Sequence, residues 1–444
     1  MLKIEKLLWD FVQKHLMLLA FIAVTGAGVA LHCNGHDFLS GDLNCYLVPW
    51  WNEIAGKGIE GLASQVGNYN IPYQIIIFLL SRTNMEPVIA YKLVSIVFDF
   101  ALALSAALLT RTLSKSKFAP LIAYAAVLCS FNTWLNSCFW GQCDSIYVTF
   151  IVLAIFFLLK EKPIPSFIML GLALAFKLQV IFILPAFFYY YVSTRKVSLL
   201  HFLIVPAVNF LLCMPAVFCG RPFNEIFTVY LEQTETYHQI QMNCPNVYAL
   251  MMNGNSTANF DSFKPAALAL TALMLTAGLV FVLKTKVSLD DPRSFFMAAI
   301  WSSYTMLIFM PAMHERYSYL PDLLIILFAV IWCKYIWAAI LCNFISLRGY
   351  CFYLFSEYQM ADIRYAAIAL LAVYIYLTAQ FARDFLSRPC PEPPITEDVN
   401  ITENTNNTEN TNNTENTEDT ENTEKTENTE NTDNAENTKN PQNA

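Results

Sequence analysis

Long apolar runs recur along the first 388 residues of this chain and then stop. A helix needs about 20 mostly apolar residues to cross a bilayer core, or fewer where neighbouring helices cover its ends. Such runs lie at about 15–32, 87–110, 119–136, 145–160, 164–177, 179–193, 199–219, 265–284, 295–312, 317–334, 335–355 and 362–382. The pattern predicts an all-α polytopic membrane protein with about 12 transmembrane helices.

Three apolar runs are short for a membrane span. We expect the runs at 164–177 and 179–193 to stop at a water-filled cavity instead of crossing the bilayer completely. The run Ile71–Leu80 has only about ten residues, too few to cross the bilayer as a helix. It is interpreted as a re-entrant or interfacial helix within a long first extracytoplasmic loop, which covers residues 33–86.

The distribution of Lys and Arg predicts the orientation, because cytoplasmic loops carry an excess of these residues. If the N-terminal lysines are cytoplasmic, alternation of the spans puts every basic short loop on that side. The basic positions are Lys3, Lys6, Lys14, Arg111, Lys115, Lys117, Lys160, Lys162, Arg195, Lys196, Lys284, Lys286, Arg293, Arg383 and Arg388. Both termini are then cytoplasmic, and the membrane is the plasma membrane if the cell is bacterial.

The composition changes abruptly after residue 388. The whole chain is 56% hydrophobic and 14% charged, whereas about a quarter of the residues of soluble domains are charged. Residues 389–444 repeat Asn, Thr and Glu with 14 acidic and 2 basic residues, so the net charge of −8 arises in this tail. Such a segment cannot bury enough apolar surface to fold. We predict a transmembrane domain at 1–388 and a disordered tail at 389–444.

The cysteines and buried charges give less specific signals. The 12 cysteines show no CxxC or Cys/His spacing typical of a metal site, so neither a metal nor a cofactor is expected. Cys33 and Cys45 lie in one outer loop, where a disulfide is the alternative to two free thiols. Asp99 lies inside an apolar run and is expected to pair with an intramembrane group such as Lys92.

The first outer loop contains two candidate bases, Asp37 and Asp42, directly after the first span. A partly desolvated carboxylate is more basic and less screened than one in water, so it can take a proton from a sugar hydroxyl. The alternative role for Asp42 is to cap an interfacial helix.

A second outer turn, Trp140–Asp144, places Gln142 and Asp144 beside an aromatic residue. Acceptor-rich edges of this kind hold polyols, and the alternative is that Asp144 caps the following helix. Lys177 and Gln179 lie where two short helices meet. A lysine in an apolar hairpin is either paired or binds an anion such as a lipid phosphate, unless it snorkels to the interface.

A third cluster, Met313–Tyr317, contains three consecutive ionisable residues between two apolar runs. Arg316 can bind a phosphate through two hydrogen bonds, and His314 can donate to it. The alternative is an interfacial Arg–Glu pair that sets the tilt of a helix. The cluster is not an HExxH motif, so a zinc site has no support. The long outer loop at 220–264 adds amides and tyrosines, a composition suited to carbohydrate.

Together these motifs resemble one family. The bacterial membrane proteins related to the second mannosyltransferase of GPI-anchor synthesis, which are GT-C glycosyltransferases, carry similar motifs in the same order. The resemblance covers roughly residues 10–385 and excludes the tail. The motifs are Ser40-Gly41-Asp42, Trp140-Gly141-Gln142-Cys143-Asp144-Ser145, Phe176-Lys177-Leu178-Gln179, Asn243–Tyr248 and Met313–Tyr317.

The resemblance implies a GT-C-like fold and an inverting glycosyltransferase. It would move mannose or another hexose from a polyprenyl-phosphate donor to an extracytoplasmic glycan or glycolipid acceptor. The implied general base is Asp42, with Asp37 as a neighbouring candidate. Lys177, His314 and Arg316 would bind the donor phosphate. The expected sugar and acceptor contacts are Gln142, Asp144, Gln179, Tyr69, Asn243, Asn246 and Glu315.

The expected partners are the bilayer, the lipid-linked sugar and the acceptor, and no nucleic acid. The sequence departs from the family pattern at Ile71, where a second proline is common, and at Ser318, where an aromatic residue is common. Neither change removes a reactive group, so they affect only the expected sugar preference.

A transporter or flippase of lipid-linked sugars is the main alternative, because it would also be polytopic with a carbohydrate-binding lining. Transport sites usually lie near the membrane midplane, on broken helices of internal repeats. No internal repeat is evident in this sequence, and its polar groups gather at one face. A structural membrane protein is a weaker alternative, because so many ionisable groups at one face are costly without a ligand. The pattern therefore favours the glycosyltransferase.

Overall fold

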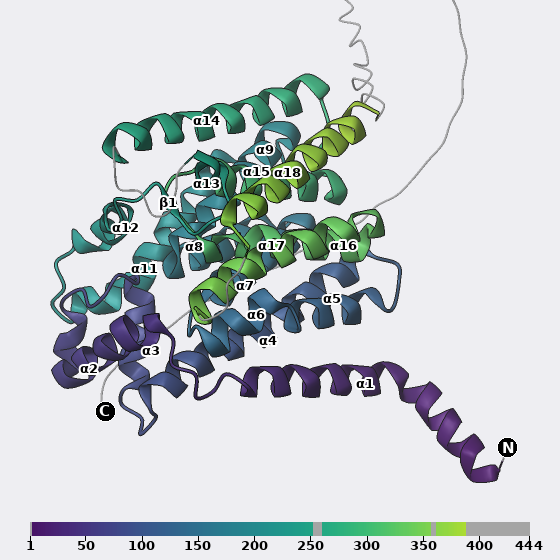
Figure 1. The fold of residues 1–444 in the computed structure, drawn as a ribbon, viewed down its shortest axis with the longest axis horizontal. Helices are drawn as coiled ribbons and strands as arrows, with labels where there is room; N and C mark the ends of the chain where they lie inside the picture. Colours follow the sequence, from purple (N-terminus) through teal and green to yellow (C-terminus); the bar gives the residue numbers. More distant parts are fainter. Residues whose placement is uncertain (1, 252–259, 357–360, 388–444) are drawn as a thin grey trace, which may run out of the picture. The chain divides into compact units, whose positions relative to one another are not determined.

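The computed structural model describes residues 2–251, 260–356 and 361–387, and 79% of these residues are helical (Figure 1). This confirms the all-α prediction. The predicted tail at 389–444 lies outside the described residues, so both the tail and the domain boundary at 388 stay predictions.

The N-terminal elements form one long helix, a largely helical first loop and two further apolar helices. They are α1 (Lys3–Cys33), η1 (Leu43–Leu47), α2 (Val48–Lys57), η2 (Gly58–Leu62), α3 (Ile71–Leu80), α4 (Pro87–Leu113), α5 (Ala119–Leu128), α6 (Phe131–Trp134) and η3 (Leu135–Phe139). Here η marks a short 3₁₀ or π helix. The elements η1 and η3 are π-helical, and η2 is a 3₁₀ helix.

The central elements are shorter helices and one short strand. They are α7 (Asp144–Leu159), α8 (Pro163–Phe176), η4 (Leu178–Phe182), α9 (Leu184–Thr194), α10 (Leu199–Phe202), α11 (Ile204–Phe218), α12 (Glu225–Glu235), β1 (Gln241–Met242) and α13 (Val247–Met251).

The C-terminal elements are mostly long helices. They are α14 (Phe260–Thr285), α15 (Pro292–Phe309), β2 (Met313–His314), η5 (Glu315–Ser318), α16 (Tyr319–Ile331), η6 (Cys333–Tyr335), α17 (Ile336–Leu354) and α18 (Ile363–Leu386). The two strands β1 and β2 pair in parallel.

The predicted count of twelve membrane spans is not confirmed, although all twelve apolar runs are helical. Among the described residues, six helices are long and apolar enough to cross a bilayer, or seven if the pair α5 and α6–η3, bent by 44°, counts as one span. The remaining runs form shorter helices, such as α7 with 16 residues and α16 with 13. Helices of this length fall short of the usual requirement for a span. The chain is an integral membrane protein, as its several long apolar helices indicate.

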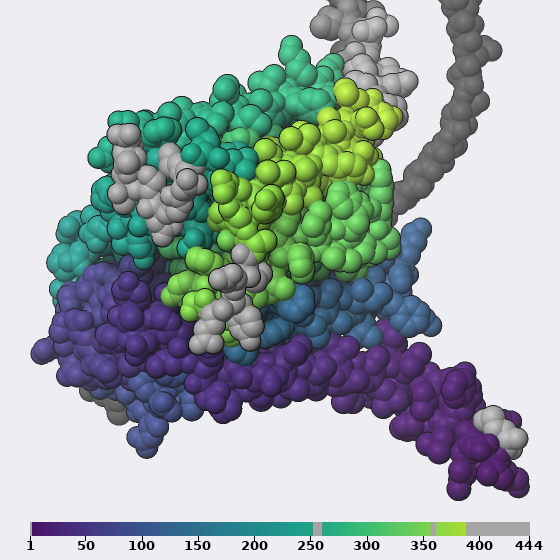
Figure 2. Space-filling model, viewed as in Figure 1, coloured from purple at the N-terminus to yellow at the C-terminus, as the bar shows by residue number. Residues whose placement is uncertain are grey.

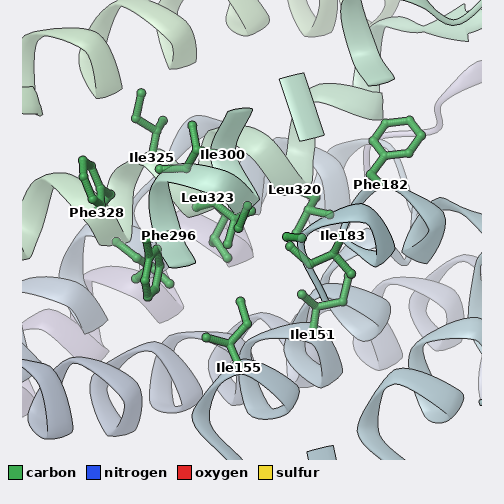
Figure 3. Packing of buried hydrophobic residues seen from close by; sticks show 14 of the residues in the cluster. Ile151, Ile155, Phe182, Ile183, Phe296, Ile300, Leu320, Leu323, Ile325 and Phe328 are labelled. Atoms are coloured by element: carbon green, nitrogen blue, oxygen red, sulfur yellow. The ribbon is translucent and has the colours of Figure 1, made fainter. Parts of the chain in front are cut away.

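The apolar core lies among the short central helices. Its buried side chains include Ile151 of α7, Ile183 beside η4, Ile300 of α15 and Leu323 of α16 (Figure 3). These side chains pack against neighbouring helices, and such packing contacts stabilise the short apolar helices.

The opposite case is α1, whose N-terminal part is the purple segment at the edge of Figure 2. Only 11% of its most apolar window is buried within the protein. Leu7, Trp9 and Phe11 are exposed, as expected for a helix that contacts lipid.

Loops that were predicted to be cytoplasmic contact one another. Lys196 pairs with Glu161 and with Asp290, each at 2.7 Å, and Arg293 pairs with Asp384 at 3.1 Å. From Arg293, the 18 residues of α15 lead to Met313–Tyr317, a helix length of about 27 Å. The basic loops and the polar cluster are therefore separated by nearly the thickness of a bilayer core, which is about 30 Å.

The expected pairing of Asp99 with Lys92 is wrong. Asp99 Oδ2 contacts His32 Nε2 at 3.0 Å, and both side chains are buried. Lys92 instead donates to the backbone carbonyls of Gly35, His36 and Phe38 in the first loop. Two turns of α4 separate Lys92 from Asp99, which lets each residue find a nearer partner in α1 or in the loop after it.

Candidate active site

A cavity of about 640 Å³ opens where the first loop, the turn before α7, the break between α8 and η4, and the segment at 313–317 meet. Residues far apart in the sequence line it together. The predicted site residues in its wall are Asp42, Tyr69, Gln142, Lys177, Gln179, His314, Glu315 and Arg316.

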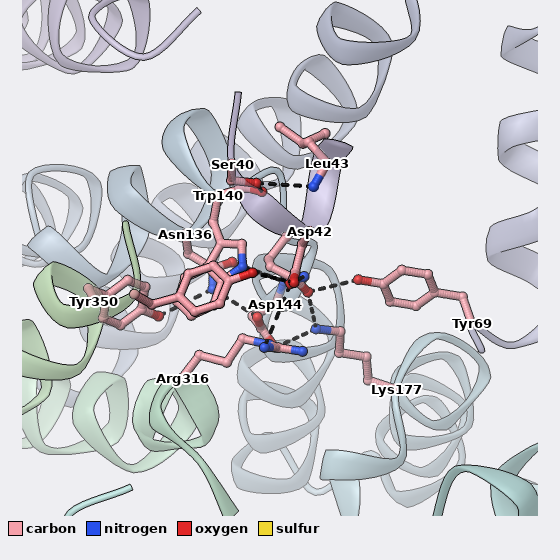
Figure 4. A network of polar contacts seen from close by, with 12 residues as sticks. Ser40, Asp42, Leu43, Tyr69, Asn136, Trp140, Asp144, Lys177, Arg316 and Tyr350 are labelled. Atoms are coloured by element: carbon pink, nitrogen blue, oxygen red, sulfur yellow. Dashed lines mark hydrogen bonds and ion pairs between the residues drawn. The ribbon is translucent and has the colours of Figure 1, made fainter. Parts of the chain in front are cut away.

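Asp42 lies at the start of the helix that η1 and α2 form. Its side chain makes no capping hydrogen bond to this helix, so the capping alternative is wrong. Oδ2 accepts from Trp140 Nε1 at 2.8 Å and from Gln142 Nε2 at 2.7 Å, and Oδ1 accepts from the hydroxyl of Tyr353 (Figure 4). A carboxylate offers about four lone-pair sites, so this one keeps room for a further donor from the cavity.

The turn before α7 brings Trp140 and Gln142 to Asp42 because Gly141 adopts a left-handed conformation, with φ +78°. A side chain at Gly141 would lie within 2.8 Å of Leu43, so the two segments approach this closely only with glycine. Ser40 ties the same segments together. Its hydroxyl donates to the Trp140 carbonyl at 2.7 Å and accepts from the Leu43 amide at 3.2 Å.

Lys177 is buried and paired, so the snorkelling alternative is wrong. Its Nζ contacts Asp144 Oδ1 at 2.7 Å and Gln142 Oε1 at 3.4 Å, and it lies 5.8 Å from the centre of the Tyr69 ring. Asn136 Nδ2 donates to the other oxygen of Asp144 at 2.8 Å. Gln142 therefore links the two charged groups, because its nitrogen donates to Asp42 while its oxygen faces Lys177.

Arg316 lies next to Asp42, with 3.9 Å between Nη1 and Oδ2. Its guanidinium is also 5.2 Å from the ring centre of Trp140 and 5.8 Å from that of Tyr317. Burial acts to lower the pKa of Arg316, but the carboxylate of Asp42 and other neighbours raise it above its usual value. Within the described part of the chain, Arg316 Nε has no hydrogen-bond partner.

The strand pair β1–β2 holds the segment of His314 against the second outer loop. Gln241 pairs with Met313, Met242 with His314, and Asn243 forms a further bridge to His314. Burial, together with the charges of Arg316 and Lys177, holds the pKa of His314 well below its usual range. The His314 ring therefore faces the cavity as a neutral imidazole.

Glu315 is a second acidic group in the cavity wall, and its side chain is buried. Burial raises its pKa to about 7, although Arg316 acts in the opposite direction. The carboxyl group is thus poised to change its charge near neutral pH.

Four predicted residues lie elsewhere. Asp37 is 79% exposed and contacts His36, whereas Asp42 is 17% exposed and faces the cavity. Asp144 is buried behind Lys177 and is not part of the cavity wall. Asn246 caps α13, because its Oδ1 accepts from the amides of Tyr248 and Ala249. Asn243 has φ +58° and lies in the bridge to His314.

Sequence reasoning missed Tyr353 and Trp140 as partners of Asp42. Tyr353 stacks on Trp140 with 4.1 Å between ring centres and an interplanar angle of 11°. It lies near the end of α17, in an apolar run with no polar motif around it, so no local signal pointed to it. Tyr46 and Trp50 were not predicted as site residues, yet they line the cavity from the first loop.

A second cavity of about 300 Å³ adjoins the first and shares its residues Gln179, Gln233, Tyr237, His314 and Tyr317. The rest of its wall is largely apolar and includes Ile181, Phe182, Leu268 and Met310. The polar cavity thus adjoins a largely apolar one between η4, α12 and α14.

Two further expectations concern a disulfide in the first loop and a metal site. Cys33 and Cys45 are both free thiols, so the disulfide alternative is wrong in this structure. In the described ranges, no three His, Cys, Asp or Glu side chains come close enough to hold a metal ion. That the reaction needs no metal or cofactor stays a prediction.

These features define a helical integral membrane protein with a polar cavity that shares part of its wall with an apolar one. The sequence from residue 69 to 311, more than half of the chain, matches the profile of glycosyltransferase family 87. The chain therefore belongs to this family of GT-C-like membrane glycosyltransferases and is a glycosyltransferase. The resemblance to the GT-C glycosyltransferases is thereby confirmed. No curated protein matches the chain. Asp42 and the segment at 313–317 lie outside the matched range, so their roles are argued from the geometry.

Proposed function

We propose that this protein is an inverting glycosyltransferase. It transfers mannose or another hexose from a polyprenyl-phosphate donor to a glycan or glycolipid on the extracytoplasmic side of the membrane. The observation that carries this proposal is the placement of Asp42 and Arg316 in one cavity, 3.9 Å apart. A base for a hydroxyl and a cation for a phosphate are the two groups that such a transfer needs.

In the proposed reaction, the Asp42 carboxylate takes the proton from an acceptor hydroxyl. The hydroxyl oxygen forms a bond to the anomeric carbon from the face opposite the phosphate. The bond between that carbon and the phosphate oxygen breaks, and the electron pair leaves with the polyprenyl phosphate. The hydrogen bonds from Trp140, Gln142 and Tyr353 fix the carboxylate for this step.

The leaving phosphate gains about one negative charge as it changes from a diester to a monoester, and cationic donors fixed at that position stabilise it. We assign the direct contact to Arg316, because it lines the cavity and its side chain keeps 16% of its surface exposed. Lys177 already pairs with Asp144 and adds its charge from behind. The neutral His314 can donate one hydrogen bond to the phosphate.

The second cavity suits the lipid part of the donor. Its wall is largely apolar, and it begins at His314 and Tyr317, where the phosphate would lie. The polyprenyl chain would leave the site along this cavity toward α14, which is mostly exposed to the surroundings of the protein. Membership of a glycosyltransferase family and a site at one end of α15 both favour this reaction over transport.

The test is transfer from synthetic polyprenyl-phosphate hexoses by the purified protein in detergent or liposomes. Asp42→Asn should reduce turnover by about 10²–10⁴, the usual contribution of a general base. Asp37→Asn, a matched change of an exposed carboxylate in the same loop, should leave turnover unchanged.

Two results would contradict the proposal. Full turnover by Asp42→Asn would remove Asp42 as the base. A wild-type protein that consumes none of the lipid-phosphate hexoses would exclude this class of donor.

A further inference from the structure

Two parts of the wall of the polar cavity differ in chemistry. One part, which includes His314 and Tyr317, is shared with the apolar cavity, where the donor lipid is proposed to lie. Another part is formed by the first loop, including Tyr46, Trp50 and Gly67. An inverting attack approaches from the face opposite the leaving phosphate. The acceptor is therefore assigned to the first-loop part of the wall.

The first-loop helix presents Asp42, Tyr46 and Trp50 to the cavity at intervals of four residues. Residues four apart lie on one face of a helix, and the π-helical turn at Leu43–Leu47 still keeps such residues nearly in line. Another face of the helix is fixed in the core, where Leu43 and Trp51 are buried. At a rise of about 1.5 Å per residue, the backbone at positions 46 and 50 lies about 6 and 12 Å along the helix from Asp42. The ring centres of Tyr46 and Trp50 are 5.9 Å apart.

The indole of Trp50 is held in place from behind. A side chain at Gly67, which has φ +71°, would lie 2.4 to 2.6 Å from indole atoms Cδ2, Cε2 and Cε3, so the glycine packs against the ring face. Gln65 donates to the carbonyls of Gly67 and Tyr69, and Arg221 donates to Gln65 at 2.7 Å. Because the ring is already ordered, little conformational entropy is lost when a ligand packs on it.

We propose that Tyr46 and Trp50 form a subsite for the sugar units that precede the reacting one in the acceptor. The proposal rests on the function of Asp42 as the base. Aromatic rings bury the C–H face of a pyranose while its hydroxyls stay hydrated at the edge. An axial spacing of about 12 Å between positions 42 and 50 exceeds the length of one hexose ring. The acceptor class is therefore an extended glycan with at least two sugar units.

The experiment compares matched alkyl mono- and diglycosides of mannose, glucose and galactose as acceptors, at a saturating concentration of the donor. The corresponding soluble disaccharides without an alkyl chain form a second arm. It separates a glycolipid acceptor from the end of a free glycan. The variants are Trp50→Ala, Trp50→Phe and, as a control, Trp9→Ala, which removes an exposed ring on α1.

We expect the wild type to prefer diglycosides. Trp50→Ala should raise the KM for the diglycoside about tenfold, which corresponds to loss of one ring contact. It should leave the KM for the monoglycoside unchanged. Trp50→Phe should recover part of the loss, and Trp9→Ala should behave as wild type.

The inference is overturned if Trp50→Ala changes mono- and diglycoside kinetics equally or changes neither. It is also overturned if the wild type consumes donor but transfers to none of these glycosides. Asp42→Asn separates this failure from failure of the proposed function. If Asp42→Asn abolishes transfer while Trp50→Ala has no effect, only the acceptor subsite is wrong. If Asp42→Asn keeps full turnover, the base assignment itself fails.

Discussion

Asp42 and Asp99 are both carboxylates held beside a basic group, and they differ in what else they can reach. Asp99 is fully buried against His32, and neither residue lines the polar cavity or the apolar one beside it. Asp42 is bound by three donors and lies near Arg316, yet it keeps one side open to a cavity of about 640 Å³. A buried charge pair alone is therefore a poor guide to reaction chemistry. Access for a substrate distinguishes the two sites.

The comparison predicts that loss of Asp99 impairs folding rather than catalysis. Asp99→Ala leaves His32 without its partner, and breaking a buried pair costs about 3–5 kcal/mol of stability. Thermal unfolding in detergent should show the loss, while turnover per folded molecule and both KM values stay near wild type. If Asp99→Ala keeps the wild-type Tm but loses turnover as Asp42→Asn does, Asp99 would also be needed for the reaction. That result would contradict the comparison between the two carboxylates.

A smaller effect is expected from Tyr353→Phe, which removes one of the three donors to Asp42. Since a hydrogen bond to a charged group contributes about 1.5–3 kcal/mol, kcat should fall about tenfold or more with little change in either KM. Tyr365→Phe is the control, because this exposed tyrosine lies outside the cavity wall. Equal kcat values for Tyr353→Phe and wild type would show that the other two donors suffice to orient the base.

The smallest predicted effect concerns pH. Glu315 has a pKa of about 7, so it is neutral below that value and adds a negative charge to the cavity above it. That charge repels the donor phosphate, and the donor KM should rise severalfold between about pH 6 and pH 8. Glu315→Gln should make the donor KM nearly independent of pH over this range. A wild-type donor KM that is flat from pH 6 to 8 would contradict this.

The sequence predicted local and chemical features well. Every apolar run is helical, and residues from three distant motifs, Asp42, Lys177 and Arg316, meet in one cavity as expected. Hydrophobic periodicity and the free-energy cost of placing a charge in an apolar segment can both be judged from the local sequence.

Features that depend on the fold could not be predicted. His32 and Tyr353 lie in apolar runs, and only packing shows that they contact Asp99 and Asp42. Asn246 and Asp144 are polar residues in the right motifs, yet one caps a helix and the other neutralises Lys177. Residue type indicated that these groups were special, but which neighbour each one serves is decided by tertiary structure.

The hydrogen bond between Asp42 and Tyr353 joins residues that are 311 positions apart. A chain that is inserted into the membrane from its N-terminus holds Asp42 long before α17 is synthesised. The Asp42 carboxylate therefore lacks one of its hydrogen-bond donors, Tyr353, until the chain has been synthesised as far as α17. Completion of the proposed site is thus a late event in biosynthesis. A truncated chain that lacks α17 carries Asp42 but not the full set of hydrogen bonds that orient its carboxylate.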